Sequence, residues 1–188
     1  MRKLTVFNHV SLDGYFVDIN GDFSWARSHD EDAEWNAFVE ENAKGGGTLL
    51  FGRVTYDLMA SYWPTPLASQ HDPDLARRMN ELPKVVFSRT LAKAAWSNTK
   101  LVKGDLAAEV RKLKEGQGSD MAILGSGSIV AQLSLAGLID EYHIVVNPII
   151  LGQGKTLFDG LKEKLRLKLT SSRTFRNGNV LLSHELAA

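Results

Sequence analysis

Short apolar runs alternate with longer segments of helical periodicity along most of this 188-residue chain. Parallel strands need long crossover connections, usually helices, so such an alternation predicts an α/β fold with a mostly parallel sheet and helices on both faces. The predicted strands cover residues 4–10, 48–51, 84–88, 100–103, 121–124 and 141–148. The predicted helices cover 30 or 32 to 44, 54–62, 74–82, 106–115 and 129–138.

Two further segments complete the predicted fold. Residues 164–174 and 179–184 flank Asn177-Gly178, a turn typical of hairpins, so they predict a closing antiparallel pair at one edge of the sheet. Residues 63–73 contain three prolines and are predicted to form a loop. We find no repeat or linker, which favours a single domain over residues 1–188.

Composition restricts the classes of function. Lys plus Arg equals Asp plus Glu at 22 each, and this balance argues against a broad nucleic-acid surface. The chain contains no cysteine, so disulfides, thiol catalysis and zinc–thiolate sites are excluded, and its five histidines show no metal-ligand spacing. With no apolar run long enough for a signal peptide or membrane span, we expect a cytoplasmic protein that does not contact a membrane.

Two glycine-rich segments are candidates for anion binding, and the sequence favours only the first of them. Gly125-Ser126-Gly127-Ser128 joins a predicted strand to a predicted helix, where glycines allow close approach and free N–H groups attract a phosphate. A tight turn that binds nothing is the alternative, and Val130 replaces the third glycine of the Rossmann fingerprint. The segment 152–156 resembles the tail of a P-loop, but Ile149 occupies the position of the leading glycine, which favours an ordinary loop.

Two other turns carry arginine directly after a predicted strand. Gly52-Arg53-Val54-Thr55 follows one strand and Ser88-Arg89-Thr90 follows the next. Ligands of open α/β sheets bind at the carboxyl ends of the strands, and guanidinium groups bind phosphate through a planar fork of donors. Each arginine alone would be an ordinary solvated side chain. Together with the turn at 125–128, they indicate a dinucleotide that carries an additional phosphate.

Five motifs occur in an order that resembles the dihydrofolate-reductase-like superfamily, and more closely the C-terminal reductase domain of bacterial riboflavin-biosynthesis deaminase/reductase proteins. They are Ser11-Leu12-Asp13-Gly14, residues 50–56, Ser88-Arg89, residues 124–127 and residues 148–154. The resemblance implies a three-layer fold, a stand-alone NADPH-dependent reductase and a homodimer that pairs through residues 164–186. Its substrate would be a pteridine-like or ribosylaminopyrimidine-like heterocycle, as for 5-amino-6-(5-phosphoribosylamino)uracil reductase.

The resemblance also assigns cofactor residues. The 2′-phosphate and pyrophosphate would lie near Gly52, Arg53, Thr55, Ser88 and Arg89, and the pyrophosphate and nicotinamide near Gly125, Ser126, Gly127 and Ser128. Replacing Gly125 or Gly127 with valine is expected to block the cofactor without disturbing the fold.

Asp32 is the candidate proton donor, because it precedes Trp35 by three residues as the carboxylate of dihydrofolate reductases precedes a tryptophan. A helix N-cap is an equally good interpretation of this aspartate. The candidate substrate residues are Asp13, Trp25, Trp35 and Lys155, with Lys155 or Arg27 as the partner of a substrate phosphate. The alternatives are a non-catalytic NADPH-binding module, dihydrofolate reductase activity proper, or a structural protein whose glycine turns bind nothing.

Overall fold

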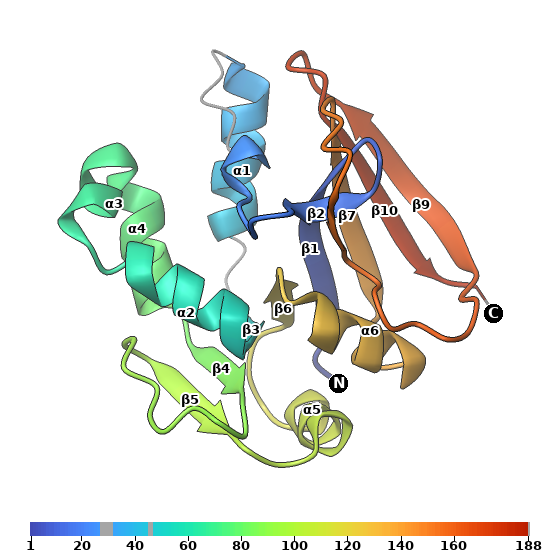
Figure 1. Ribbon diagram of the computed structural model, residues 1–188. Helices are drawn as coiled ribbons and strands as arrows, with labels where there is room; N and C mark the ends of the chain where they lie inside the picture. The colour runs from blue at the N-terminus through green and yellow to red at the C-terminus, as the bar shows by residue number, and fades with distance from the viewer. Residues whose placement is uncertain (27–31, 45–46, 188) are drawn as a thin grey trace.

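The computed structural model describes residues 1–26, 32–44 and 47–187 (Figure 1). Its main sheet has the strand order β5-β4-β3-β6-β1-β7-β10-β9. The pairings from β5 through to β7 are all parallel, whereas β10 is antiparallel to both of its neighbours. The strands are β1 (Leu4–Ser11), β3 (Thr48–Gly52), β4 (Lys84–Phe87), β5 (Thr99–Val102), β6 (Met121–Leu124), β7 (Glu141–Asn147), β9 (Leu167–Thr174) and β10 (Val180–Leu186).

Helices cover both faces of this sheet, which confirms the predicted three-layer α/β fold (Figure 1). They are α1 (Ala33–Lys44), α2 (Arg53–Tyr62), α3 (Pro66–His71), α4 (Pro73–Glu81), α5 (Leu106–Glu115) and α6 (Gly127–Leu135). Side chains of α5 and α6 pack with Leu50 and Val6 on one face. The other face carries Phe51 under α2 and α4, and Val145 under α1. Every residue of β3 is buried, as expected for a strand inside the sheet.

The proline-containing segment differs from the prediction. Residues 66–71 are helical, so the predicted loop over 63–73 is wrong in its second half, whereas α4 at 73–81 confirms the helix predicted over 74–82 to within one residue. Pro66 and Pro73 each occupy the first position of a helix, where the missing N–H has no intrahelical partner to lose. The preceding residues, Thr65 and Asp72, accept amide hydrogen bonds as N-caps.

A second, two-stranded sheet was not foreseen. β2 (Tyr15–Asp18) pairs antiparallel with β8 (Gly154–Thr156), placing Val17 opposite Lys155. A Cβ atom on Gly154 would lie 2.2 Å from the carbonyl oxygen of Val17, so no other residue type fits at that position. We call this pair of strands the β2–β8 ribbon. A 3-10 helix, Ser24–Ala26, follows β2.

The C-terminal hairpin is confirmed. β9 and β10 pair around Asn177-Gly178, and Gly178 has φ of +86°. All eight residues of β9 are exposed, including Leu167 and Leu169. The expected homodimer would use this surface and stays a prediction. None of the described helices is long and apolar enough to span a bilayer.

Candidate functional site

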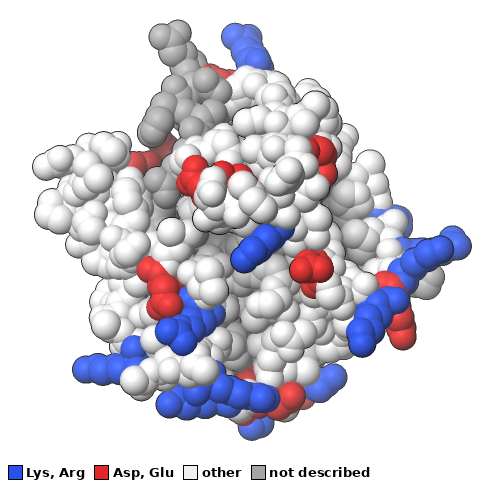
Figure 2. Space-filling view, in the orientation of Figure 1, with Lys and Arg blue, Asp and Glu red and all other residues white. Residues whose placement is uncertain are grey.

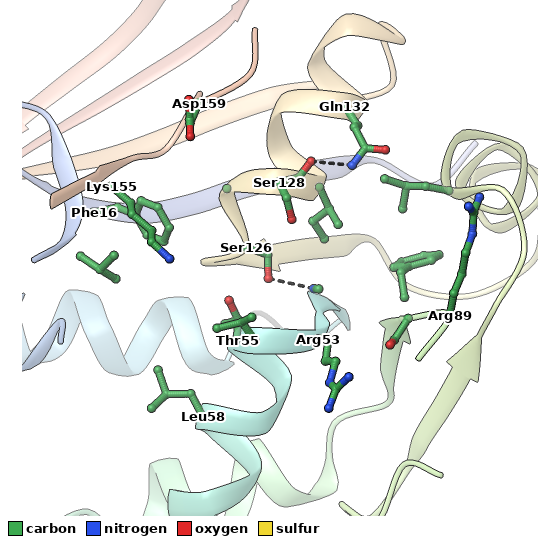
Figure 3. Close-up of a pocket in the computed structure, with 18 of the residues that line it drawn as sticks. Phe16, Arg53, Thr55, Leu58, Arg89, Ser126, Ser128, Gln132, Lys155 and Asp159 are labelled. Carbon is green, nitrogen blue, oxygen red and sulfur yellow. Dashed lines mark hydrogen bonds between the residues drawn. The ribbon is translucent and has the colours of Figure 1, made fainter. Parts of the chain in front are cut away.

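A cavity of about 680 Å³ opens at the carboxyl ends of β3, β4, β5 and β6. The turns that leave these strands form most of its wall, and the β2–β8 ribbon forms the rest. Figure 2 shows that the molecule is hollowed near the middle of this face. Basic side chains gather along the lower edge of the molecule in this view. Figure 3 shows the side chains around the cavity.

The β3–α2 turn contributes the N-terminus of a helix. Gly52 is the N-cap of α2 in an extended conformation, with φ of −78°, and provides no side-chain cap. Its own N–H donates to Ser126 Oγ across 2.8 Å. The first N–H groups of α2 therefore lack a side-chain cap and, with the positive end of the helix dipole, favour an anion in the cavity.

The β6–α6 turn contributes a second helix N-terminus. Gly125 and Ser126 both adopt left-handed conformations, with φ of +63° and +62°. Asn8, buried on β1, accepts the Gly125 N–H at 2.8 Å through Oδ1 and holds this turn from below. Ser126 is the N-cap of α6, but its hydroxyl makes no cap bond to that helix. The start of α6, like that of α2, therefore presents amide groups free of a side-chain cap.

The two arginines of the site, Arg53 and Arg89, differ in the hydrogen bonds and ion pairs that they form with other described residues. Arg53 donates to Asp57 Oδ2 at 3.3 Å and to Thr90 Oγ1 at 2.6 Å, which ties α2 to the β4–β5 connection. Ser88 Oγ accepts the N–H groups of Thr90 and Leu91 and shapes the same connection. Arg89 also lines the cavity, and among the described residues it has no hydrogen-bond or ion-pair partner. Its guanidinium is thus the better placed of the two for an incoming phosphate.

The opposite end of the cavity is formed by the β2–β8 ribbon. Figure 3 shows Lys155 beside the ring of Phe16, with its ammonium pointing into the cavity and Thr55 across from it. Asp159 also lines this end. The cavity therefore combines an arginine at one end with an aromatic ring and one lysine at the other.

All but one of the nominated cofactor residues line this single cavity. They are Gly52, Arg53, Thr55, Ser88, Arg89, Ser126, Gly127 and Ser128. Gly125 is the exception: it does not line the cavity, and it lies close to the side chain of Thr55, which does. Among the nominated substrate residues, only Lys155 reaches the cavity.

The other nominated substrate residues lie outside this cavity, and their role in binding substrate stays a prediction. Trp35 is 3% exposed and packs against Phe175 and His9 in the core. Trp25 donates its ring N–H to the carbonyl of Asp22 and does not line the cavity. Asp13 bonds to two backbone amides outside the cavity wall. Arg27 and Asp30 lie outside the described residues.

Asp32 occupies the N-cap position of α1. Its Oδ1 accepts the N–H groups of Glu34 and Trp35, and its Oδ2 accepts that of Asn177 at 3.1 Å. Burial would raise the pKa of this carboxyl group, but backbone N–H groups, of Trp35 and Asn177 first, outweigh burial and lower it. Asp32 does not line the cavity. The cap interpretation is therefore observed, whereas the role as proton donor stays a prediction that this geometry disfavours.

The glycine substitutions expected to spare the fold would not do so. A Cβ on Gly125 would lie 2.8 Å from Thr55 Cγ2, in a left-handed backbone conformation. On Gly127 it would lie 3.0 Å from the Leu157 carbonyl oxygen and 3.2 Å from the Phe16 ring. A side chain at Gly125 would displace Thr55, and one at Gly127 would press on the Leu157 backbone and the Phe16 ring. A loss of binding in either valine variant would therefore not report on a cofactor.

Sequence reasoning missed part of the cavity wall. The β5–α5 turn contributes Gly104, Asp105 and Leu106, and Phe16 and Asp159 enter from the ribbon side. The sequence does contain a signal for the first group, since Gly104-Asp105 stands between a strand and a helix, the same kind of junction that Gly52-Arg53 occupies. Asp105 differs from Gly52 in capping its helix by accepting the Ala108 N–H.

Comparison with known proteins places this arrangement in a family. A model of the RibD C-terminal domain matches residues 2–181. The chain belongs to this family. It is 30% identical over 179 residues to the uncharacterized protein YyaP of Bacillus subtilis (strain 168), covering 95% of this chain and 92% of YyaP. It is also 25% identical to the uncharacterized protein YwjB of the same organism, covering 93% and 92%.

Solved structures show the same fold. A putative riboflavin biosynthesis protein from Shewanella sp. PV-4 superposes with a TM-score of 0.75 at 24% identity, covering 99% of both chains. The deaminase/5-amino-6-(5-phosphoribosylamino)uracil reductase of Thermotoga maritima gives 0.71 at 15% identity, covering 99% of this chain and 57% of that one. Dihydrofolate reductase from Enterococcus faecalis, complexed with NADP(H), gives 0.64 at 12% identity, covering 99% and 97%. The fold is therefore dihydrofolate-reductase-like.

Proposed function

We propose that this member of the RibD C-terminal domain family is an NADPH-dependent reductase that acts on a pteridine-like or ribosylaminopyrimidine-like heterocycle. The observation that carries the proposal is the convergence of two helix N-termini and two arginine-bearing turns on one cavity. Each part alone is common in α/β proteins. Their meeting at the carboxyl ends of parallel strands is what a dinucleotide with an extra phosphate requires.

The residues present fit NADPH. The uncapped first turns of α2 and α6 would hold the pyrophosphate, because they offer N–H donors and the positive ends of two helix dipoles. Arg89 would hold the 2′-phosphate, and Arg53 and Ser88 line the same part of the cavity. NADPH, when bound, supplies a hydride from its nicotinamide ring. The task of the chain is to hold that ring against the substrate and to keep bulk water away from it.

The ribbon end of the cavity would receive the substrate. The Phe16 ring offers an aromatic face to a planar heterocycle, and the Lys155 ammonium would hold an anionic substituent such as a phosphate. The names of the Thermotoga protein, a 5-amino-6-(5-phosphoribosylamino)uracil reductase, and of the Enterococcus protein, a dihydrofolate reductase, support this substrate class. Dihydrofolate itself stays an alternative substrate.

A non-catalytic NADPH-binding module is the second candidate, and one observation favours it. Asp32, the nominated proton donor, is committed to capping α1 and does not line the cavity. If no other group provides a proton, the cavity would bind the cofactor without turnover.

Titration with NADPH and NADH, followed by NADPH oxidation assays, separates these functions. We expect binding of NADPH, monitored by quenching of tryptophan fluorescence, and oxidation in the presence of a ribosylaminopyrimidine phosphate or a pteridine. Binding without oxidation across dihydrofolate, quinonoid pteridines and ribosylaminopyrimidines would favour the module. A chain that binds neither cofactor would refute both candidates.

A further inference from the structure

Asp13 connects two turns that lie far apart in the sequence. Its Oδ1 accepts the N–H of Leu151 at 3.1 Å, and its Oδ2 accepts that of Gly152 at 2.7 Å. The hydroxyl of Ser11, which is buried, donates to Oδ1 at 2.6 Å and fixes the orientation of the carboxylate. Asp13 is therefore bound on both oxygens, while it stays outside the cavity wall.

These two turns lead directly into the β2–β8 ribbon. The first turn ends where β2 begins, at Tyr15, and the second ends where β8 begins, at Gly154. The ribbon belongs to neither edge of the main sheet, because its strands pair only with each other. Its position over the cavity is therefore set by its attachments and by the packing of Phe16 against the main core. The Leu12 N–H donates to the Ile149 carbonyl between the same two turns at 2.8 Å, and the carboxylate of Asp13 lies at the point where both strands start.

The ribbon supplies the cavity with the residues of its substrate end. Phe16 and Val17 come from β2, and Lys155 and Thr156 come from β8. The arginine end, by contrast, is built on β3, β4 and β6, which are held by the parallel pairings of the main sheet. A shift of the ribbon would thus move Lys155 and Phe16 relative to Arg89 without disturbing the sheet.

We propose that Asp13 is a positioning residue that sets Lys155 and Phe16 over the cavity by clamping the β1–β2 turn to the β7–β8 turn. This inference deepens the proposed function and rests on it where substrate binding is concerned. The role requires a charged carboxylate, since two N–H groups and one hydroxyl all donate to it. The same donors, the Ser11 hydroxyl first, lower the pKa of Asp13, so it remains ionised near neutral pH.

The test uses Asp13→Asn, which keeps the size of the side chain but turns one oxygen into an NH₂ group that cannot accept. Hydrogen exchange monitored by mass spectrometry is measured first, without any ligand. Amides in residues 14–20 and 150–158 should exchange about tenfold faster or more, because local opening of the ribbon becomes easier. Amides in residues 121–135, in β6 and α6, should keep the wild-type rate.

Asp120→Asn is the matched control. Asp120 is also a carboxylate that accepts a distant backbone N–H, that of Lys3 at 2.7 Å, but it lies at the opposite end of the parallel strands. This variant should leave exchange in the ribbon unchanged. Unchanged exchange of the ribbon in Asp13→Asn, or equal effects of the two variants there, would overturn the inference.

A double-mutant cycle with a ribosylaminopyrimidine phosphate, titrated into the NADPH-bound protein, then separates positioning from general destabilisation. Asp13→Asn should weaken binding of this substrate probe by roughly 3- to 10-fold in the wild-type background, the effect expected for one lost interaction, and should leave NADPH binding unchanged. In the Lys155→Ala, Phe16→Ala background, the same change should have no further effect, because the groups that Asp13 positions are gone. Additive losses would refute the positioning role. A wild type that binds no NADPH would refute the proposed function, and the exchange experiment alone would then decide whether Asp13 orders the ribbon.

Discussion

Ser126 Oγ accepts the backbone N–H of Gly52 at 2.8 Å, although 74 positions separate the two residues in the chain. This bond joins the β6–α6 turn to the β3–α2 turn, so the two helix N-termini at the cavity are held in a fixed relation. In this position Ser126 adopts a left-handed backbone conformation, with φ of +62°. Such a conformation costs a residue with a side chain about 1–2 kcal/mol.

Ser126→Ala is therefore expected to reduce the free energy of unfolding by about 1–3 kcal/mol, since a buried N–H loses its acceptor. Ser126→Gly should be about 1 kcal/mol more stable than Ser126→Ala, because glycine tolerates the left-handed conformation. Ser128→Ala, an exposed position on the same turn, is the control and should leave stability unchanged. Denaturant unfolding measures all three. Equal stability of the glycine and alanine variants would contradict the strain argument.

Gly52→Ala is a cleaner probe of the cofactor than any change at Gly125. A Cβ on Gly52 would have no neighbour closer than 3.5 Å, whereas one on Gly125 would lie 2.8 Å from Thr55. Gly52→Ala should keep the fold and weaken NADPH binding, because the added methyl group stands at the cavity wall. Gly125→Ala should lower the melting temperature. Calorimetry and titration compare the two variants, and full NADPH affinity in Gly52→Ala would argue against a phosphate at the α2 N-terminus.

Loss of Asp32 should affect stability rather than cofactor binding. Asp32→Ala removes the acceptor of two backbone amides at the start of α1 and of one in the turn between β9 and β10, and should lower the melting temperature. Its NADPH affinity should equal that of the wild type, because Asp32 does not line the cavity. If Asp32→Asn kept its stability but lost turnover with an identified substrate, the proton-donor role would be restored.

His9 should make stability depend on pH. Burial lowers the pKa of its ring to about 4, between Phe7 and Trp35 and beside Asn147. The unfolded chain takes up this proton near pH 6.5, so the stabilisation is complete above that pH and is lost as the pH falls towards 4. The loss should reach roughly 3 kcal/mol across this window. His9→Gln should remove this part of the slope, and identical slopes for both proteins would show that His9 titrates normally when folded.

The sequence was sufficient for most of the parallel sheet, since its central strands have distinct apolar runs and every crossover except that from β4 to β5 has a helical period. It was insufficient for the β2–β8 ribbon, because strands of three and four residues carry little local signal and owe their pairing to tertiary contacts such as those of Asp13. The helix that begins at Pro66 was missed because proline marks both loops and first helical positions.

Part of the candidate site could likewise be predicted from the sequence, and part of it could not. Residues on turns directly after strands, such as Arg53 and Ser126, could be placed from the sequence because parallel strands bring their carboxyl ends together. Trp35 could not, since helical periodicity allows either face of α1 to be buried and the core required this side chain. Asp32 fits both a cap and an acid by sequence, and only its hydrogen bonds distinguish them.

The central claim is that the cavity binds a dinucleotide with a 2′-phosphate, and Arg89→Ala tests it most directly. Arg89 lines the cavity without a partner among the described residues, whereas Arg53 is already bonded to Asp57 and Thr90. Dissociation constants of NADPH and NADH are measured for the wild type and for both arginine variants. We predict that Arg89→Ala weakens NADPH by about 10- to 150-fold and NADH little, and that Arg53→Ala is less selective. Equal losses of NADPH and NADH in Arg89→Ala would contradict the account.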